Sequence, residues 1–234
     1  MKNGPLFFLG LFAALALSYA GIVLGSNAQL GSLQPYFDEN DNKVYPERSG
    51  LAARGQWVYG DLGCAACHTQ QTRRPDFGAD QARGWGDRQS YARDYIYQPR
   101  VQLGQMRIGP DLANLAMRKP PFDTDDLMTL LYVGTPSHPS YKFLFEEKKI
   151  VGQRSDRALK LSSKFAPPAG HEVVPTERAQ VLISYLQGLN NSFAYPAETA
   201  ANTVKHEAKE GAHAPAAGAH DEKAPAKTQE GAHK

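Results

Sequence analysis

The pentapeptide Cys-Ala-Ala-Cys-His at residues 64–68 constrains this chain more than any other feature. Its two cysteines are the only ones among 234 residues, which excludes a disulfide framework or a four-cysteine metal site. A thioredoxin-type dithiol would need a βαβ context, and the sequence shows none. A zinc site would need more ligands at short spacing. Cys-x-x-Cys-His is the attachment pattern of c-type haem, in which each sulfur of Cys64 and Cys67 forms one thioether and His68 can bind the iron. The motif predicts one covalent haem c.

The N-terminus carries an uncharged, almost wholly apolar segment at residues 5–25. This length is about what a helix needs to cross the hydrocarbon core of a membrane. A cleaved signal peptide is the alternative, with a possible cleavage site at residues 26–28, but the apolar run is long for one. We predict a retained, single-pass anchor in the lipid bilayer over residues 1–28. Lys2 precedes the span, which favours a cytoplasmic N-terminus and a periplasmic haem domain.

Composition sets the remaining bounds. Lys and Arg total 26 and Asp and Glu 24, so the net charge is +2 and nucleic acid is not expected as a partner. The length fits one domain with extensions. Residues 29–50 are polar with prolines and indicate a linker, which leaves residues 51–195 for the haem domain.

Three segments show the apolar periodicity of helices, whereas strand patterns are sparse. The first, residues 51–62, leads directly into the haem motif. The second, residues 124–133, has Thr124 as its expected cap, and the third begins near Thr176 and ends at Gly188. The intervening stretch has no clear period and is predicted as loop around the haem, with room for one short helix. The predicted fold class is mostly α.

The C-terminal segment, residues 196–234, is low in complexity and almost free of large apolar residues. Such a segment cannot bury enough surface to fold, so we predict a disordered tail. Gly-Ala-His recurs in it three times, and weak transition-metal binding through His213, His220 and His233 is the alternative to a merely solvated tail.

The order of these elements resembles class I cytochromes c, in which a helix ends in the haem motif and a C-terminal helix crosses it. Gly109-Pro110-Asp111-Leu112 is similar to the Gly-Pro-x-Leu element of that family. The resemblance implies that the Pro110 carbonyl accepts a hydrogen bond from the second ring nitrogen of His68. A bond of this kind fixes the ring and tunes the ligand's basicity.

Joined together, the motifs between residues 5 and 190 resemble a more specific family. This is the membrane-anchored mono-haem cytochrome c subunit, subunit II, of cbb3-type cytochrome c oxidases. The motifs that carry the resemblance are Tyr59 and Gly63 with the haem motif, Thr69-Gln70, Arg74-Pro75, Tyr95, Leu103-Gly104, Arg107, residues 109–112, and Pro139-Ser140-Tyr141.

The resemblance implies one-electron transfer through haem c to the catalytic subunit of a haem–copper oxidase. Its partners would be that subunit and other cytochrome c subunits. The chain would be an electron carrier, not catalytic alone. A haem c subunit of another membrane complex, quinol-oxidising or of the dehydrogenase type, is the alternative, and a ligand sensor or peroxidase with an open iron site is a third reading.

One position departs from this family's pattern. The family carries a methionine, the sixth iron ligand, immediately before the Pro-x-Tyr element, and here that position is His138. Imidazole binds haem iron well, so we predict His68 and His138 as the two axial ligands, with Met106 as the alternative sixth ligand. Arg74 and Arg107 are candidates for pairing with haem propionates, because guanidinium matches carboxylate in bidentate geometry; surface charge is the competing explanation.

Overall fold

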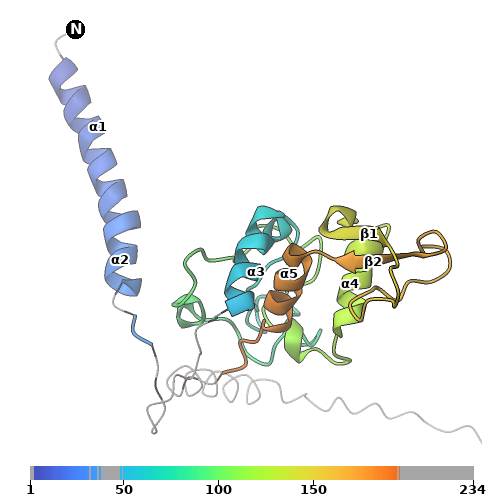
Figure 1. Ribbon diagram of the computed structural model, residues 1–234. Helices are drawn as coiled ribbons and strands as arrows, with labels where there is room; N and C mark the ends of the chain where they lie inside the picture. Colours follow the sequence, from blue (N-terminus) through green and yellow to red (C-terminus); the bar gives the residue numbers. More distant parts are fainter. Residues whose placement is uncertain are drawn as a thin grey trace, which may run out of the picture. The chain divides into compact units, whose positions relative to one another are not determined.

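The computed structural model describes residues 3–31, 33–35, 37, 48, 50–193 and 195 (Figure 1). The predicted tail at 196–234 lies outside the described residues, as does much of the predicted linker. Helices are the main regular structure in the described part, which confirms the mostly α fold class.

The N-terminal apolar segment forms one helix of 27 residues, Gly4–Leu30. It consists of α1 (Gly4–Tyr19), a π-helical turn (Ala20–Leu24) and α2 (Gly25–Leu30). Proline is tolerated at its start, because the first N–H groups of a helix have no partner there. Its most apolar stretch has a mean hydropathy of 2.2 and no buried residue. This length and surface fit a membrane anchor.

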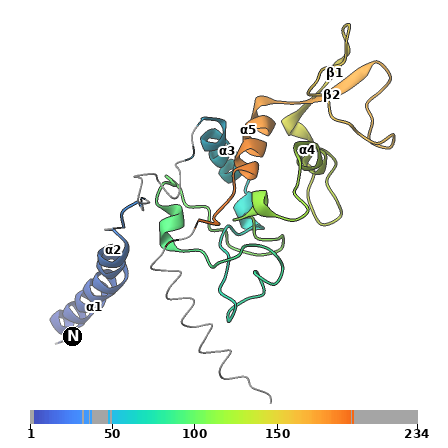
Figure 2. The same cartoon turned by 90° about the horizontal axis from the view of Figure 1, so that it is seen from below.

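The haem domain is built on two helices that lie side by side in both views, α3 (Gly50–Asp61) and α5 (Glu177–Gln187) (Figures 1 and 2). Both were predicted from periodicity, with bounds that agree to within one residue. The helices approach closely at Gly55, where an added Cβ would lie 1.9 Å from the Val181 carbonyl oxygen. One turn further along, the rings of Tyr59 and Tyr185 pack with centroids 5.4 Å apart. This crossing anchors the segment that enters the haem motif.

Helix α4 (Thr124–Val133) has the predicted bounds but not the predicted cap. The Asp126 amide donates to the Asp123 carboxylate at 2.7 Å, so Asp123 is the N-cap and the assignment to Thr124 was wrong. Aspartate and threonine are both good caps. Asp123 precedes Thr124 and caps the helix, so Thr124 is its first residue. Leu127 and Leu131 bury the apolar face of α4 in the core.

A two-stranded antiparallel sheet was not expected from the sequence. It pairs β1 (Phe145–Lys149) with β2 (His171–Pro175), with Phe145 opposite Pro175, and lies on the α4 side of the domain (Figure 2). β1 buries only Phe145, because its other four residues are two glutamates and two lysines. A strand exposed on both faces has no alternating pattern to detect.

The long segment between the haem motif and Gly109 is mostly loop, as predicted, with one short 3₁₀ helix at Ala92–Tyr95. Buried carboxylates, rather than the backbone hydrogen bonds of a sheet, fix this loop. Asp94 is fully buried and accepts two hydrogen bonds from the Arg88 guanidinium, at 2.7 and 2.9 Å. Asp111 is equally buried and accepts from the Thr69 hydroxyl at 2.6 Å. Charge-assisted bonds of this kind are the stronger ones in proteins.

Candidate functional site

The haem motif forms the turn that follows α3. Gly63 has a left-handed backbone (φ +71°), which ends the helix, and Cys64–Ala66 form one 3₁₀ turn. The His68 amide then donates to the Cys64 carbonyl at 3.0 Å. The thiols of Cys64 and Cys67 are half-buried and are not bridged to each other. Burial raises the pKa of Cys64 to about 11, so its thiol is protonated at neutral pH.

The His68 ring is fixed by a backbone carbonyl. Its Nδ1 lies 2.8 Å from the Pro110 oxygen. A carbonyl can only accept, so Nδ1 carries the hydrogen and the Nε2 lone pair is left for a metal ion. This is the hydrogen bond that the resemblance to class I cytochromes implied.

A glycine lets the segment before Pro110 pass close to this ring. An added Cβ at Gly109 would lie 2.3 Å from His68 Cε1 and 2.6 Å from Nδ1. The Gly109 amide also donates to the Cys67 carbonyl at 3.0 Å, and the Gln105 amide donates to the Ala65 carbonyl at the same distance. The 105–110 segment is therefore hydrogen-bonded to the haem motif at Ala65, at Cys67 and at the His68 ring.

His138 faces His68 from the turn after α4. In that turn Thr135 and His138 exchange backbone hydrogen bonds of 2.8 and 3.1 Å. The centroids of the two imidazoles lie 6.2 Å apart. Two imidazoles on opposite sides of one metal ion stand roughly 6 Å apart, centre to centre, because a metal–nitrogen bond is about 2 Å and the ring radius adds to each side. The spacing fits a shared iron.

The surroundings of His138 also suit a ligand. Burial lowers its pKa and outweighs the opposing effect of the Pro139 backbone, and the neighbouring His68 lowers it further, so the ring is neutral and can donate a lone pair. Its Nδ1 is buried and has no hydrogen-bond partner among the described residues. A buried polar atom without a partner is costly, so this nitrogen is open to a ligand.

A cavity of about 230 Å³ lies between the two histidines. Both cysteines and Pro110 also line it, so the structure brings five of the predicted site residues together. A histidine pair, two free thiols and an otherwise largely apolar wall fit a haem c as a donor set. The other residues that line the cavity are Tyr59, Gly63, Ile108, Gly109, Leu112, Leu131, Ser137, Pro139, Tyr141, Leu182 and Leu186.

The internal methionines lie elsewhere. Met106 and Met117 are about half exposed, Met128 packs in the core of α4, and none of the three lines the cavity. The sequence analysis left Met106 open as the alternative sixth ligand. Its position outside the cavity does not support that role.

The two arginines predicted from the sequence are not at the cavity. Arg74 is more than half exposed and pairs with Asp76 at 3.2 Å. The largely buried Arg107 donates to Asp80 and lies 3.5 Å from the Asp111 carboxylate. Their pairing with haem propionates stays a prediction from the sequence alone.

Sequence reasoning missed most of the cavity wall. Leu131 on α4 and both Leu182 and Leu186 on α5 belong to the apolar faces that the periodicity predicts for the two helices, and nothing in that pattern indicates a cavity. Ile108 had no signal at all, because it lies in a segment without a period. A wall residue and a core residue have the same apolar character, so spacing alone cannot separate them.

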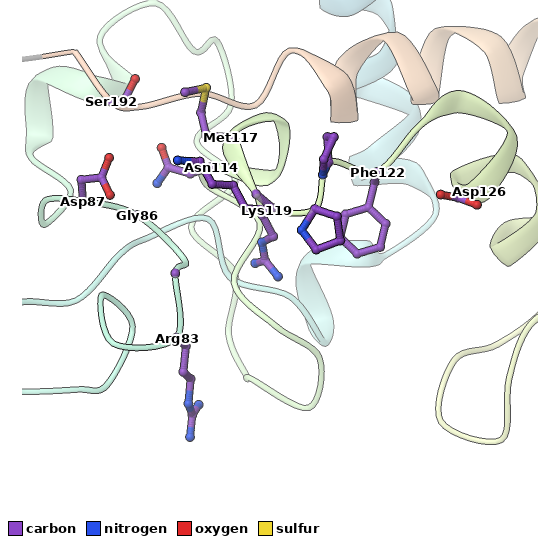
Figure 3. A pocket seen from close by; sticks show the side chains of 13 residues that line it. Arg83, Gly86, Asp87, Asn114, Met117, Lys119, Phe122, Asp126 and Ser192 are labelled. Atoms are coloured by element: carbon purple, nitrogen blue, oxygen red, sulfur yellow. The ribbon is translucent and has the colours of Figure 1, made fainter.

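A second cavity, of about 470 Å³, lies away from the cysteines and histidines (Figure 3). Asn114 and Asp87 lie toward one end, Phe122 and Asp126 toward the other, and the Arg83 side chain points away from them. Buried Asn114 lines this cavity and connects two other segments: its side chain donates to the Trp85 carbonyl at 3.1 Å and accepts from the Asn191 amide at 2.8 Å. None of the predicted site residues lines this cavity.

Comparison with known proteins places these features in one family. A search of curated proteins found no match. The family described as cytochrome c oxidase, mono-heme subunit/FixO matches residues 7–215, which include nearly all of the apolar helix and the whole cavity wall. Members carry one haem c, and covalent attachment is expected from the paired cysteines. The match covers most of the chain. It favours a subunit of a cytochrome c oxidase over a haem c subunit of a quinol-oxidising or dehydrogenase complex. The chain therefore belongs to the family of mono-haem, electron-transferring subunits of cbb3-type cytochrome c oxidases.

Proposed function

We propose that this chain delivers electrons, one at a time, to the catalytic subunit of its oxidase. The observation that carries the proposal is the pair of imidazoles 6.2 Å apart across a cavity that both cysteines line. Bound haem supplies a one-electron couple between ferric and ferrous iron. Cys64 and Cys67 would hold the haem, and His68 and His138 would bind its iron. Pro110 would keep the His68 ring in the required tautomer.

The oxygen chemistry would belong to the partners. In the described residues, no group of three or more His, Cys, Asp or Glu side chains is placed to hold a metal ion. Ligation of the iron by both His68 and His138 would suit electron transfer, and it would leave no open coordination site for a sensor or peroxidase.

The test removes this haem from the assembled oxidase. We expect the double substitution Cys64→Ala and Cys67→Ala to abolish covalent haem and to reduce donor-driven oxygen consumption to background. Carbon monoxide binding at the catalytic subunit is the control for assembly and should not change. Undiminished oxygen consumption by an assembled, haem-deficient variant would contradict the proposed delivery.

The identity of the sixth ligand gives a separate prediction. Methionine ligation raises haem potential relative to histidine, so His138→Met should raise the midpoint potential by on the order of 100 mV, within the range that axial ligands cover. It should also introduce the weak near-infrared sulfur-to-iron band. His171→Met is the control, because His171 lies outside the cavity. A sulfur-to-iron band already present in the unaltered protein would show that methionine is the ligand.

We further propose a cytoplasmic N-terminus and a periplasmic haem domain, from the basic residue ahead of the anchor helix. Protease added outside intact spheroplasts should then digest the haem-bearing fragment and leave the N-terminus protected. If only the N-terminus is cut, the protein has the opposite orientation and the proposed topology is wrong.

A further inference from the structure

A row of aromatic rings leads from the cavity to the surface. The Tyr141 ring lies 6.0 Å from the His138 ring, centroid to centroid, and the Phe143 ring lies 5.8 Å beyond Tyr141. Tyr141 lines the cavity. Phe143 does not, and it is 68% exposed. The described structure therefore joins the proposed distal ligand to solvent through two consecutive ring contacts.

Backbone hydrogen bonds fix this row to the helices. The Tyr141 amide donates to the Leu131 carbonyl of α4 at 2.7 Å, and the Leu144 amide donates to the Tyr141 carbonyl at 2.9 Å. The Thr176 amide, at the start of α5, donates to the Leu144 carbonyl at 3.0 Å. The backbone on both sides of Phe143 is therefore fixed, so little backbone entropy is lost when a partner covers the ring.

We infer that Tyr141 and Phe143 form the electron route between the distal side of the haem and the partner subunit. The inference rests on the proposed delivery of electrons. With haem bound, its ferrous iron would give up one electron in each transfer, and the cofactor of the partner subunit would accept it. The two rings are not oxidised, because they only fill the gap with packed atoms. Electronic coupling through packed atoms falls off less steeply than coupling across open solvent.

Phe143, at the exposed end of the row, is a residue type that protein interfaces favour, because aromatic side chains are enriched in them. The partner would be the oxidase subunit that holds the next redox centre, and it would cover Phe143.

The competing exit passes Ile108, which lines the cavity and is 69% exposed. The two routes predict different outcomes for a substitution at Phe143. Loss of its ring slows electron transfer only if the electron leaves on the distal side. It leaves the rate unchanged if the electron leaves past Ile108.

The experiment follows one-electron transfer in the assembled, fully reduced oxidase after flash photolysis of bound carbon monoxide in the presence of oxygen, which is the final electron acceptor. We expect Phe143→Leu to slow oxidation of this haem several-fold, with no change in its potential or spectrum. Phe143→Trp, which keeps a ring, should retain most of the rate. Phe77→Leu is the matched control, since Phe77 is 71% exposed and outside the row. If Phe143→Leu impairs assembly, Phe143→Met keeps an apolar contact without a ring.

A second readout does not depend on electron transfer. Benzoylphenylalanine at position 143 should cross-link on illumination to a neighbouring oxidase subunit. An unchanged rate in assembled Phe143→Leu, equal slowing in Phe77→Leu, or absence of a cross-link would overturn the route. Failure of the proposed function would appear differently, as a haem that stays reduced during turnover in the unaltered oxidase.

Discussion

Replacing Gly55 by alanine should separate α3 from α5 and cost the haem domain about 3 kcal/mol or more of unfolding free energy. The added Cβ would lie 1.9 Å from the Val181 carbonyl oxygen and 2.6 Å from Tyr185 Cβ. The obstacle is helix backbone, so no side-chain rotation relieves it. We expect a large drop in the denaturant midpoint and a lower yield of haem-loaded protein.

Gly60→Ala is the control in the same helix. Its Cβ would meet the flexible end of Gln102 at 3.1 Å, which can move aside. Alanine also favours helix over glycine by about 1 kcal/mol. This variant should stay within about 1 kcal/mol of the unaltered protein, and equal loss of stability in both variants would refute the close approach at Gly55.

Replacing Gly109 by alanine should displace His68 from its hydrogen bond. The new Cβ would fall 2.3 Å from the ring carbon Cε1, so the imidazole must move away from the Pro110 carbonyl. Because that bond fixes the tautomer and tilt of the ring, iron ligation weakens when it is lost. We expect the low-spin six-coordinate spectrum to change toward a high-spin form and the midpoint potential to shift.

Optical and electron paramagnetic resonance spectra of the purified variant measure this change. Gly78→Ala serves as the control, because its Cβ would meet the Arg73 side chain at 3.2 Å and the Asp80 carboxylate at 3.6 Å, and no atom of His68. A Gly109→Ala variant with an unaltered low-spin spectrum would show that the ring tolerates the added methyl group.

The parts of the site that depend on local sequence could be predicted. Cys64, Cys67 and His68 lie in one pentapeptide, and the Pro110 contact was implied by a tetrapeptide of a known family. The helices were predictable because a helix's buried face repeats over a few residues. His138 stood out only because the resemblance marked its position.

What could not be predicted depends on contacts between distant segments. Asp94 and Asp111 look like surface charges in the sequence, yet both are fully buried by partners whose identity only the fold reveals. The strand Phe145–Lys149 is held by pairing with β2 and not by its own pattern. The wall residues on α5 become neighbours of the haem motif only when α3 and α5 cross.

That crossing also imposes an order on biogenesis. Leu182 and Leu186 complete the cavity wall, yet they are synthesised more than a hundred residues after Cys67. During synthesis the thiols therefore emerge before the last part of the wall exists. A planar cofactor can approach them from that open side without any need for the finished domain to unfold. Closure by α5 would then bury the attached group, and attachment would precede final packing.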